Sequence, residues 1–225
     1  MAKLVWDNTG ERFYETGVKN VALYVFDNTS GQKKYKDGVA WNGVTAISES
    51  PSGAEPTALY ADDKKYLNLL SAEEFAASIE AYTYPDEFAE CDGSASLAEG
   101  FTIGQQARSK FALAYKTTIG NDEAGNSLGY KLHIIYNCLA APSEKAYNTI
   151  NDSPEAITFS WEISTTPVTF TIDGKEYSTA CVTIDSRTAN PSKLAALETK
   201  LFGGTEPDSK PTLVLPNEIY NDMKA

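Results

Sequence analysis

The 225-residue sequence contains a single histidine and three cysteines, and its 19 basic side chains are outnumbered by 31 acidic ones. The lone histidine, His133, excludes a zinc site built from several histidines, and a catalytic triad would depend on this residue alone. Cys91, Cys138 and Cys181 are odd in number and widely spaced, which is not typical of a disulfide framework or of a Cys-x-x-Cys metal site. We therefore expect free thiols in a reducing compartment and no metal.

The sequence also has few of the features that are typical of proteins that bind nucleic acid or insert into a membrane. Its formal net charge of −12 disfavours binding to phosphate through lysine and arginine side chains. The longest apolar run, Val21–Phe26, is far too short to cross a bilayer, and the N-terminus has no apolar signal-peptide core. These features predict a protein made in a cytosol, with no membrane insertion.

Patterns typical of catalysis are missing as well. A glycosidase needs two carboxylates that face each other across a sugar, whereas neighbours on a strand point to opposite faces. No glycine pattern typical of a nucleotide-binding loop is present. We expect no enzymatic activity and no cofactor. The acids that are adjacent in sequence lie in predicted turns or at element starts: Asp62-Asp63, Glu73-Glu74, Asp86-Glu87 and Asp122-Glu123.

Alternation of apolar and polar residues is the dominant pattern that is present, and it predicts a mainly β protein. Segments 110–116 and 130–137 alternate on either side of a turn-rich stretch and predict an antiparallel hairpin. In 157–164, Phe159, Trp161 and Ile163 share one face, which predicts a strand with one packed and one solvated side. Further strands are expected at 18–26, 39–48 and 181–185.

One helix is strongly indicated. Asn190 is a suitable N-cap, Pro191 fits the first helical position, and Gly203-Gly204 ends the apolar face of a helix over 191–202. Pro85, followed by acidic and apolar residues, indicates a second, shorter helix.

Segment 71–84 gives conflicting signals. Ser71 and Glu74 form a capping box before an alanine-rich run, which favours a helix. Phe75, Ala77 and Ile79 also alternate with polar or small residues as they would in a strand. Local propensity alone favours the helix.

Two polar stretches, 1–17 and 49–65, contain aromatic residues but show no core-forming pattern. Such excursions from a compact domain are typical of arms that become ordered against a neighbouring chain. A frayed terminus and a mobile loop are the alternative interpretation.

Four ordered blocks carry a resemblance: Trp41–Ser50, Ala61–Asp63 with Lys65-Tyr66, Ile79–Phe88, and Asn151–Glu162. Together they resemble the major tail proteins of long, non-contractile-tailed phages of Gram-positive bacteria. The resemblance extends over roughly residues 1–205 and does not reach the C-terminal segment that contains Leu213–Pro216.

The resemblance implies a tail tube subunit with a β-sandwich or partial-barrel fold, one or two short flanking helices, and an extended arm and loop. It also implies that 75–84 is a strand rather than a helix. The expected organisation is an N-terminal arm at 1–17, a β-sandwich tube domain at 18–205 with a long loop at 49–65 and a helix at 191–202, and a C-terminal extension at 206–225.

For function, the resemblance implies self-assembly into hexameric rings. These rings would stack through arm 1–17 and loop 49–65 into a conduit for the genome. The other partners would be the tape measure, tail terminator and distal tail proteins, with DNA passing through without specific binding. The protein would be located in the virion tail after assembly in the host bacterial cytoplasm. Glu49, Glu80 and Glu162 are the candidate lumen-facing acids, because they lie in or beside predicted strands. A carbohydrate-binding β-sandwich module and a secreted hydrolase domain remain alternatives.

Overall fold

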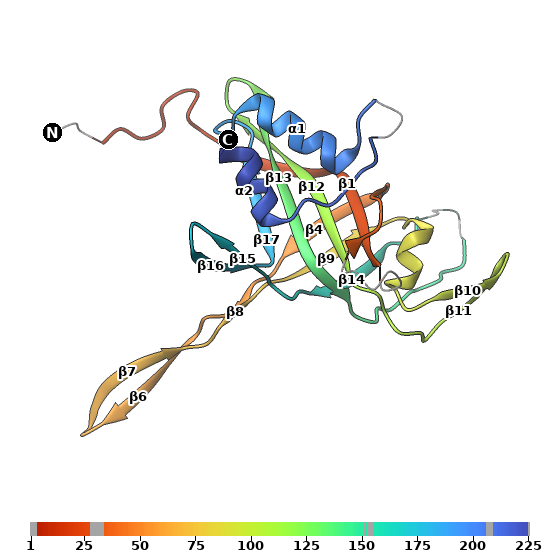
Figure 1. The fold of residues 1–225 in the computed structure, drawn as a ribbon, viewed down its shortest axis with the longest axis horizontal. Helices are drawn as coiled ribbons and strands as arrows, with labels where there is room; N and C mark the ends of the chain where they lie inside the picture. Colours follow the sequence, from red (N-terminus) through yellow and green to blue (C-terminus); the bar gives the residue numbers. More distant parts are fainter. Residues whose placement is uncertain (1–3, 28–33, 151, 153–154, 206–208, 225) are drawn as a thin grey trace.

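A computed structural model describes residues 4–27, 34–150, 152, 155–205 and 209–224. The first three residues of the expected arm, the start and last residue of the expected C-terminal extension, and residues 151, 153 and 154 of the last resemblance block lie outside this range. Within it the fold is mainly β, as the sequence predicts, with two α-helices packed against the sheet (Figure 1).

One curled antiparallel sheet forms the body of the protein. Its strand order is β2-β1-β12-β13-β14-β9-β4, with β17 also paired to β13 and β3 to β1. The first layer contains β1 (Tyr14–Asp27), β12 (Phe111–Asn121), β13 (Gly125–Ala140) and β17 (Cys181–Asp185), with the short β2 (Lys34–Tyr35) and β3 (Val39–Ala40) at its edge. The second layer contains β4 (Val44–Glu49), β9 (Ala76–Ala81) and β14 (Phe159–Ser164).

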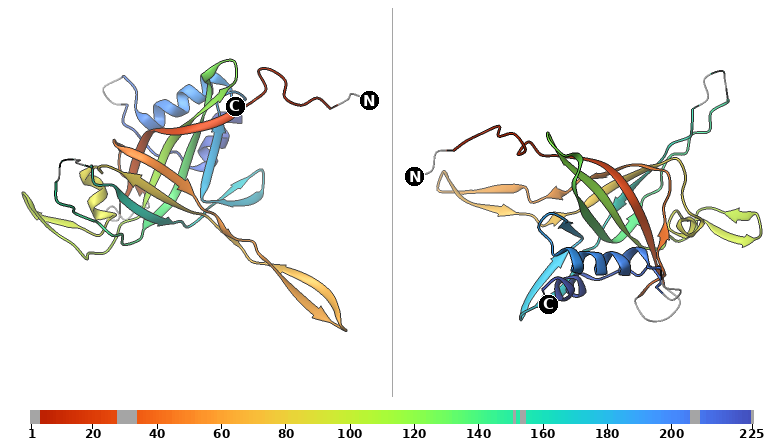
Figure 2. Two further views of the ribbon diagram at one scale, coloured as in Figure 1. Left: turned by 180° about the vertical axis from the view of Figure 1, so that it is seen from behind. Right: turned by 90° about the horizontal axis from the view of Figure 1, so that it is seen from above.

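The two layers are joined on both sides, which makes the sheet a partial barrel (Figure 2). On one side the last residues of β13, Leu139 and Ala140, pair with β14. On the other side β3 pairs with β1, and the chain then turns at Trp41 to continue as β4. The backbone N–H of Trp41 donates to the carbonyl of Val21, which ties this turn to β1.

Between the layers lies an aromatic core. The rings of Trp41 and Trp161 are 5.7 Å apart, and Phe88 packs against both. Phe88 is supplied by the 3₁₀ turn η1 (Asp86–Glu90), in the place where the sequence predicts a short helix. Trp161, Phe159 and Ile163 all face this core, whereas Ser160 and Glu162 are exposed, so the predicted faces of this strand are confirmed.

A second apolar layer covers the outer face of β1, β12 and β13. Helix α1 (Pro191–Phe202) has the bounds predicted from sequence, and the Asn190 side chain accepts from two backbone N–H groups at its start. Helix α2 (Pro216–Lys224) packs beside it. The apolar residues of this layer include Ala112, Ala114, Leu132, Ile134, Leu194, Leu197 and Leu201.

Strands β12 and β13 are therefore buried on both faces, which their alternating pattern does not indicate. Leu113 and Ile135 face the inner core, whereas Ala114 and Ile134 are equally buried under α1. The small alanines on β12 leave room for the helix to approach the sheet, and an alternating pattern does not distinguish a water-facing alanine from a helix-facing one.

Segment 71–84 forms a strand rather than a helix. Its regular part is β9, which pairs with β4 on one side and β14 on the other. Ala77, Ile79 and Ala81 point into the core, so tertiary burial outweighs the local helical preference.

Two-stranded ribbons project from the body (Figure 1). The longest contains β6 (Pro56–Ala61) and β7 (Lys64–Leu70), with β5 (Ser52–Gly53) and β8 (Glu73–Glu74) at its base. The others are β10 (Ala95–Ala98) with β11 (Phe101–Ile103), and β15 (Val168–Ile172) with β16 (Lys175–Thr179).

The expected loop at 49–65 is thus the first half of a hairpin that extends to residue 74. Asp62 and Asp63, both with positive φ (50° and 59°), make its two-residue turn. Cross-strand pairs such as Leu59 with Leu67 replace the core contacts that the sequence lacks here.

The arm is also shorter than the expected 1–17. Strand β1 begins at Tyr14, and Tyr14–Thr16 pair with Thr118–Gly120 of β12. Backbone pairing therefore orders residues that have no apolar periodicity of their own.

Candidate functional site

The outer face of the second layer is open to solvent and carries acidic and hydroxyl side chains. Ser48, Ser78, Glu80, Ser160, Glu162 and Ser164 occupy the outward positions of β4, β9 and β14. None of these three strands contains a lysine or arginine. We call these six residues the open acidic face.

Glu80 and Glu162 lie together on this face. Glu80 is directly opposite Ser160, and Glu162 is opposite Ser78, so the two carboxylates are diagonal neighbours on adjacent strands. Diagonal positions are typically about 7–8 Å apart, which limits the repulsion between two like charges. The structure therefore brings two of the three candidate acids onto one surface.

Glu49 does not belong to the open acidic face. It lies opposite Ala77, in the inward phase of β4, and accepts a 2.6 Å hydrogen bond from the Tyr115 hydroxyl. Its Oε1 is 3.5 Å from Nδ1 of His133. Hydrogen bonds from His133 and then from Tyr115 hold the pKa of Glu49 below its ordinary value of 4.5, although burial opposes this shift.

His133 is the centre of a second group of side chains, which also contains Glu15, Glu49, Tyr115 and Thr117. We call this group the inner site. Sequence alone makes His133 an ordinary residue on the polar side of a strand, but its side chain is only 12% exposed. Its ring stacks on that of Tyr115 with centroids 4.8 Å apart, and its Nε2 is 3.0 Å from the Thr117 hydroxyl. On the side away from Glu49, Nε2 is 3.5 Å from Oε1 of Glu15.

Glu15 completes the group and connects it to the N-terminal strand. Its carboxylate is bound by Lys131 and by the hydroxyl of Thr117. Burial raises the pKa of Glu15, but these two hydrogen bonds and the charges of Lys131 and His133 together outweigh burial, and the pKa is lowered overall. His133 thus lies between Glu15, at the start of β1, and Glu49, at the end of β4, where the long hairpin begins.

The N-terminal arm leaves the body in a fixed direction. The backbone N–H of Gly10 donates to both carboxylate oxygens of Asp122, and the Asn121 amide donates to the carbonyl of Gly10 at 2.8 Å. Beyond this anchor the arm presents Leu4, Val5 and Trp6, which are 72%, 67% and 74% exposed. This apolar segment is not covered by any of the residues that the structure describes.

The long hairpin presents apolar side chains on both faces. Within the described part of the chain, strands β6 and β7 pair only with each other, and the ribbon extends away from the body (Figure 1). Its exposed large residues are Leu59, Tyr60, Tyr66, Leu67, Leu69 and Leu70.

Residues with other possible chemistry are dispersed. The adjacent acids lie at the hairpin tip (Asp62-Asp63), in β8, in η1 and in the β12–β13 turn. Among the described residues, no three His, Cys, Asp or Glu side chains are grouped so that they could hold a metal ion. The cysteines are free thiols, and burial raises the pKa of Cys91 to about 12.

In the part of the chain that the structure describes, neither helix has the length and apolar character needed to cross a membrane. No protein-family model matches the chain, and no curated protein matches its sequence. Among solved structures, the chain is similar to a component of the "Cryo-EM structure of the anti-feeding prophage (AFP) baseplate, 6-fold symmetrised". The identity is 9%, the match covers 80% of this chain and 97% of that chain, and the TM-score is 0.35. A likeness at this TM-score carries no argument about function.

Proposed function

We propose that the protein is a self-assembling structural subunit of a phage tail tube. In this proposal six copies close into a ring, and the rings stack into a conduit through which the genome passes. The ordered sequence blocks that resemble major tail proteins support the family, and the geometry of the chain supports assembly.

The observation that carries the proposal is the long hairpin of β6 and β7. Its apolar side chains remain exposed on both faces, and an isolated two-stranded ribbon in water is marginally stable at best. Burial of Leu69 and Leu70, which are 55% and 70% exposed, therefore requires another chain. A hairpin that reaches beyond its own subunit is suited to joining adjacent subunits or rings.

The open acidic face is the proposed lumen surface. Glu80 and Glu162 would place carboxylates around the bore in each ring, and Arg108, which lines the same hollow as Glu162, is paired with Asp92 at 3.6 Å. Such a wall repels phosphate, so DNA passes without binding. Glu49 is not part of this proposed surface, because its carboxylate is engaged with Tyr115 and His133.

The remaining parts of the proposal concern partners and place. The tape measure protein would occupy the same bore before ejection, and the terminator and distal tail proteins would close the two ends of the tube. No catalytic role is proposed. Assembly would take place in the bacterial cytoplasm, and the mature protein would be in the virion tail.

Electron microscopy of the purified protein tests assembly. The wild-type chain should form rings or tubes. A variant in which residues 54–72 are replaced by Asn-Gly joins Gly53 to Glu73, which are already a cross-strand pair, and should remain folded. We expect this variant to give the same thermal transition of the body but no tubes. Tubes of normal length from the variant would contradict the role of the hairpin.

Charge reversal tests the lumen. Glu80→Lys and Glu162→Lys should each assemble normally but slow genome ejection from particles, most strongly at low salt, because each new cation can neutralise a passing phosphate. Glu87→Lys, in the exposed part of η1, is the matched surface control. Ejection at the wild-type rate from both lumen variants at low salt would contradict the lumen assignment.

The carbohydrate-binding alternative predicts an aromatic platform on one surface. Trp41 and Trp161 are buried, and the exposed tyrosines instead lie on five separate segments: Tyr14 in β1, Tyr60 and Tyr66 on the long hairpin, Tyr82 after β9, Tyr147 before β14 and Tyr177 in β16. Retention of a strictly monomeric protein on glycan arrays would favour that alternative.

A further inference from the structure

A small apolar pocket lies where the edge of the first layer meets the end of helix α1. It has a volume of about 220 Å³ and is lined by Asn20, Val21, Val39, Leu201, Phe202 and Pro211, together with adjoining small residues. We call it the edge pocket. Its size suits a single large side chain.

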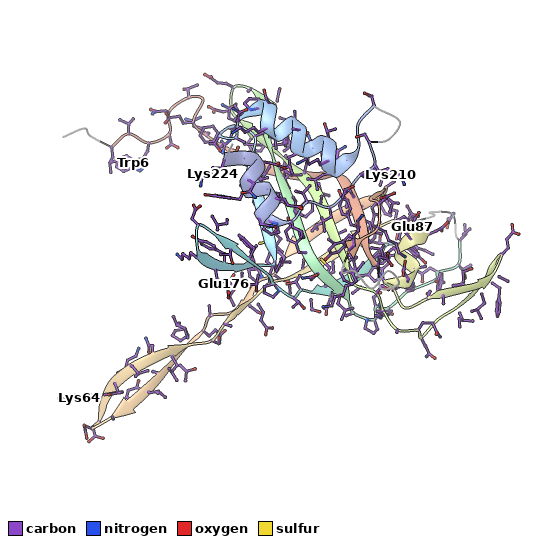
Figure 3. The ribbon with its side chains drawn as sticks, viewed as in Figure 1. Trp6, Lys64, Glu87, Glu176, Lys210 and Lys224 are labelled. Atoms are coloured by element: carbon purple, nitrogen blue, oxygen red, sulfur yellow. The ribbon has the colours of Figure 1, made fainter. Side chains whose placement is uncertain are left out.

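The chain carries one exposed tryptophan, but that residue cannot reach its own edge pocket. Figure 3 shows Trp6 and Lys210, the neighbour of Pro211, at opposite sides of the molecule. The arm is directed away from the pocket by the hydrogen bonds of Gly10 with Asp122 and Asn121. A second copy of the chain must therefore supply any Trp6 that enters the pocket.

The charges on the N-terminal arm and at the rim of the edge pocket are complementary. Asp7 directly follows Trp6, and Lys19 directly precedes Asn20 at the pocket rim. Lys19 is in register with Lys116, whose Nζ lies 5.3 Å from the ring of Phe202 and pairs with Glu198 at 2.8 Å. Neither Asp7 nor Lys19 has an ion-pair partner among the residues that the structure describes.

The other charges at the rim do not oppose this pairing. Lys210 is paired with Asp37 at 2.9 Å, so these two cancel, and Lys116 is neutralised by Glu198. Lys19 is thus the rim lysine that has no ion-pair partner among the described residues.

We propose that Trp6 of one copy inserts into the edge pocket of another copy, with Asp7 pairing with Lys19. The contact is heterologous, because the arm and the pocket are different surfaces of the same chain, and it repeats from copy to copy. It rests on the proposed self-assembly and assigns to the arm a specific receiving site. An aromatic anchor in an apolar pocket is the type of contact that typically dominates a protein interface.

Assembly of substituted full-length chains tests the contact. Trp6→Ala should raise the protein concentration needed for half-maximal assembly, followed by sedimentation, by about tenfold or more. Tyr147→Ala, at a residue that is 75% exposed against 74% for Trp6, is the matched control and should shift it by less than about twofold. Ala40→Phe, which places a ring at the rim of the pocket, should reproduce the effect of Trp6→Ala.

A charge swap tests the pairing independently of stability. Asp7→Lys and Lys19→Asp should each weaken assembly, and the double variant should recover most of the loss. Absence of any recovery would overturn the Asp7–Lys19 contact.

Cross-linking between copies tests the geometry directly. A Trp6→Cys chain mixed with an Ala40→Cys chain should give a covalent dimer under copper–phenanthroline oxidation, whereas mixing with Leu97→Cys should give none. Cross-links of equal yield to both would overturn the proposal.

If wild-type tubes form and Trp6→Ala tubes form at the same protein concentration, the pocket contact is wrong but the tube function stands. A wild-type chain that stays monomeric at every concentration contradicts both.

Discussion

The two layers of the barrel use the same alternating pattern but end with different outer surfaces. On β13, Leu132 and Ile134 alternate with inward residues and are buried under helix α1. On β14, Ser160 and Glu162 alternate with Trp161 and face solvent. The first layer, which contains β13, is therefore covered on both faces, whereas the second layer, which contains β14, is covered on its inner face only.

The difference leaves the outer face of the second layer open to solvent, whereas that of the first layer is covered. Helices α1 and α2 cover only the first layer, and the outward positions of the second layer are serine, glutamate and alanine. A solvated face is normal for an antiparallel sheet. The three strands of the second layer carry carboxylates and hydroxyls but no lysine or arginine, and Arg108, which lines a hollow beside Glu162, is paired with Asp92. This is the surface that we propose for the lumen.

Loss of the shared core should have the largest effect on stability. Trp161 is fully buried between the layers, and its indole N–H donates to Asp92 at 3.0 Å. Trp161→Ala should lower the free energy of unfolding by about 3–5 kcal/mol, because it leaves a large cavity. Urea denaturation of hairpin-deleted monomer, in which 54–72 are replaced, measures this without assembly. Trp161→Phe, which keeps a ring, should lose clearly less; an equal loss would contradict the packing role.

The comparison between the outer faces predicts the next largest effect. Leu132→Ala, on the outer face of β13, should cost about 2–5 kcal/mol because that position packs against the helices. Ser160→Ala, on the outer face of β14, should change stability by no more than about 0.5 kcal/mol. The same denaturation experiment compares them. Similar losses at both positions would mean that the second layer is also covered in the monomer.

Much of the fold could be predicted from sequence because the local signals agree with the final environment. Asn190, Pro191 and the following glycines define helix α1, whose cap and apolar face are both used as expected. In β14 the alternation of Trp161 with polar residues matches a core on one side and water on the other. The β12–β13 hairpin follows from its alternating strands and turn-rich connection.

The features that could not be predicted from the sequence depend on contacts between segments that are distant in the chain. Burial of Ala112 and Ala114 requires a helix some 80 residues later in the chain. His133 becomes a partly buried contact of two carboxylates only because β1, β12 and β4 converge there, and its neighbours in sequence are ordinary strand residues. For the same reason, Glu49 could not be separated from the acids of the open face, although Ile47 two residues earlier gives a hint of its inward phase.

The smallest predicted effect distinguishes the inward acid from the outward ones by pH. Hydrogen bonds from His133 and Tyr115 lower the pKa of Glu49 from its ordinary value of 4.5. A lowered folded-state pKa contributes stability above the unfolded-state pKa, and this contribution is lost as the pH falls through the folded-state value. Glu49→Gln should therefore destabilise the monomer at neutral pH, and its deficit relative to wild type should shrink as the pH falls below about 4.5. Because the Glu49 side chain is 40% exposed, water weakens the effect, and we expect less than about 1 kcal/mol.

Tyr115→Phe removes one of the two donors, so the deficit caused by Glu49→Gln should be smaller in that background. A deficit that is independent of pH in both backgrounds would show that Glu49 makes no charge-dependent contact with the inner site.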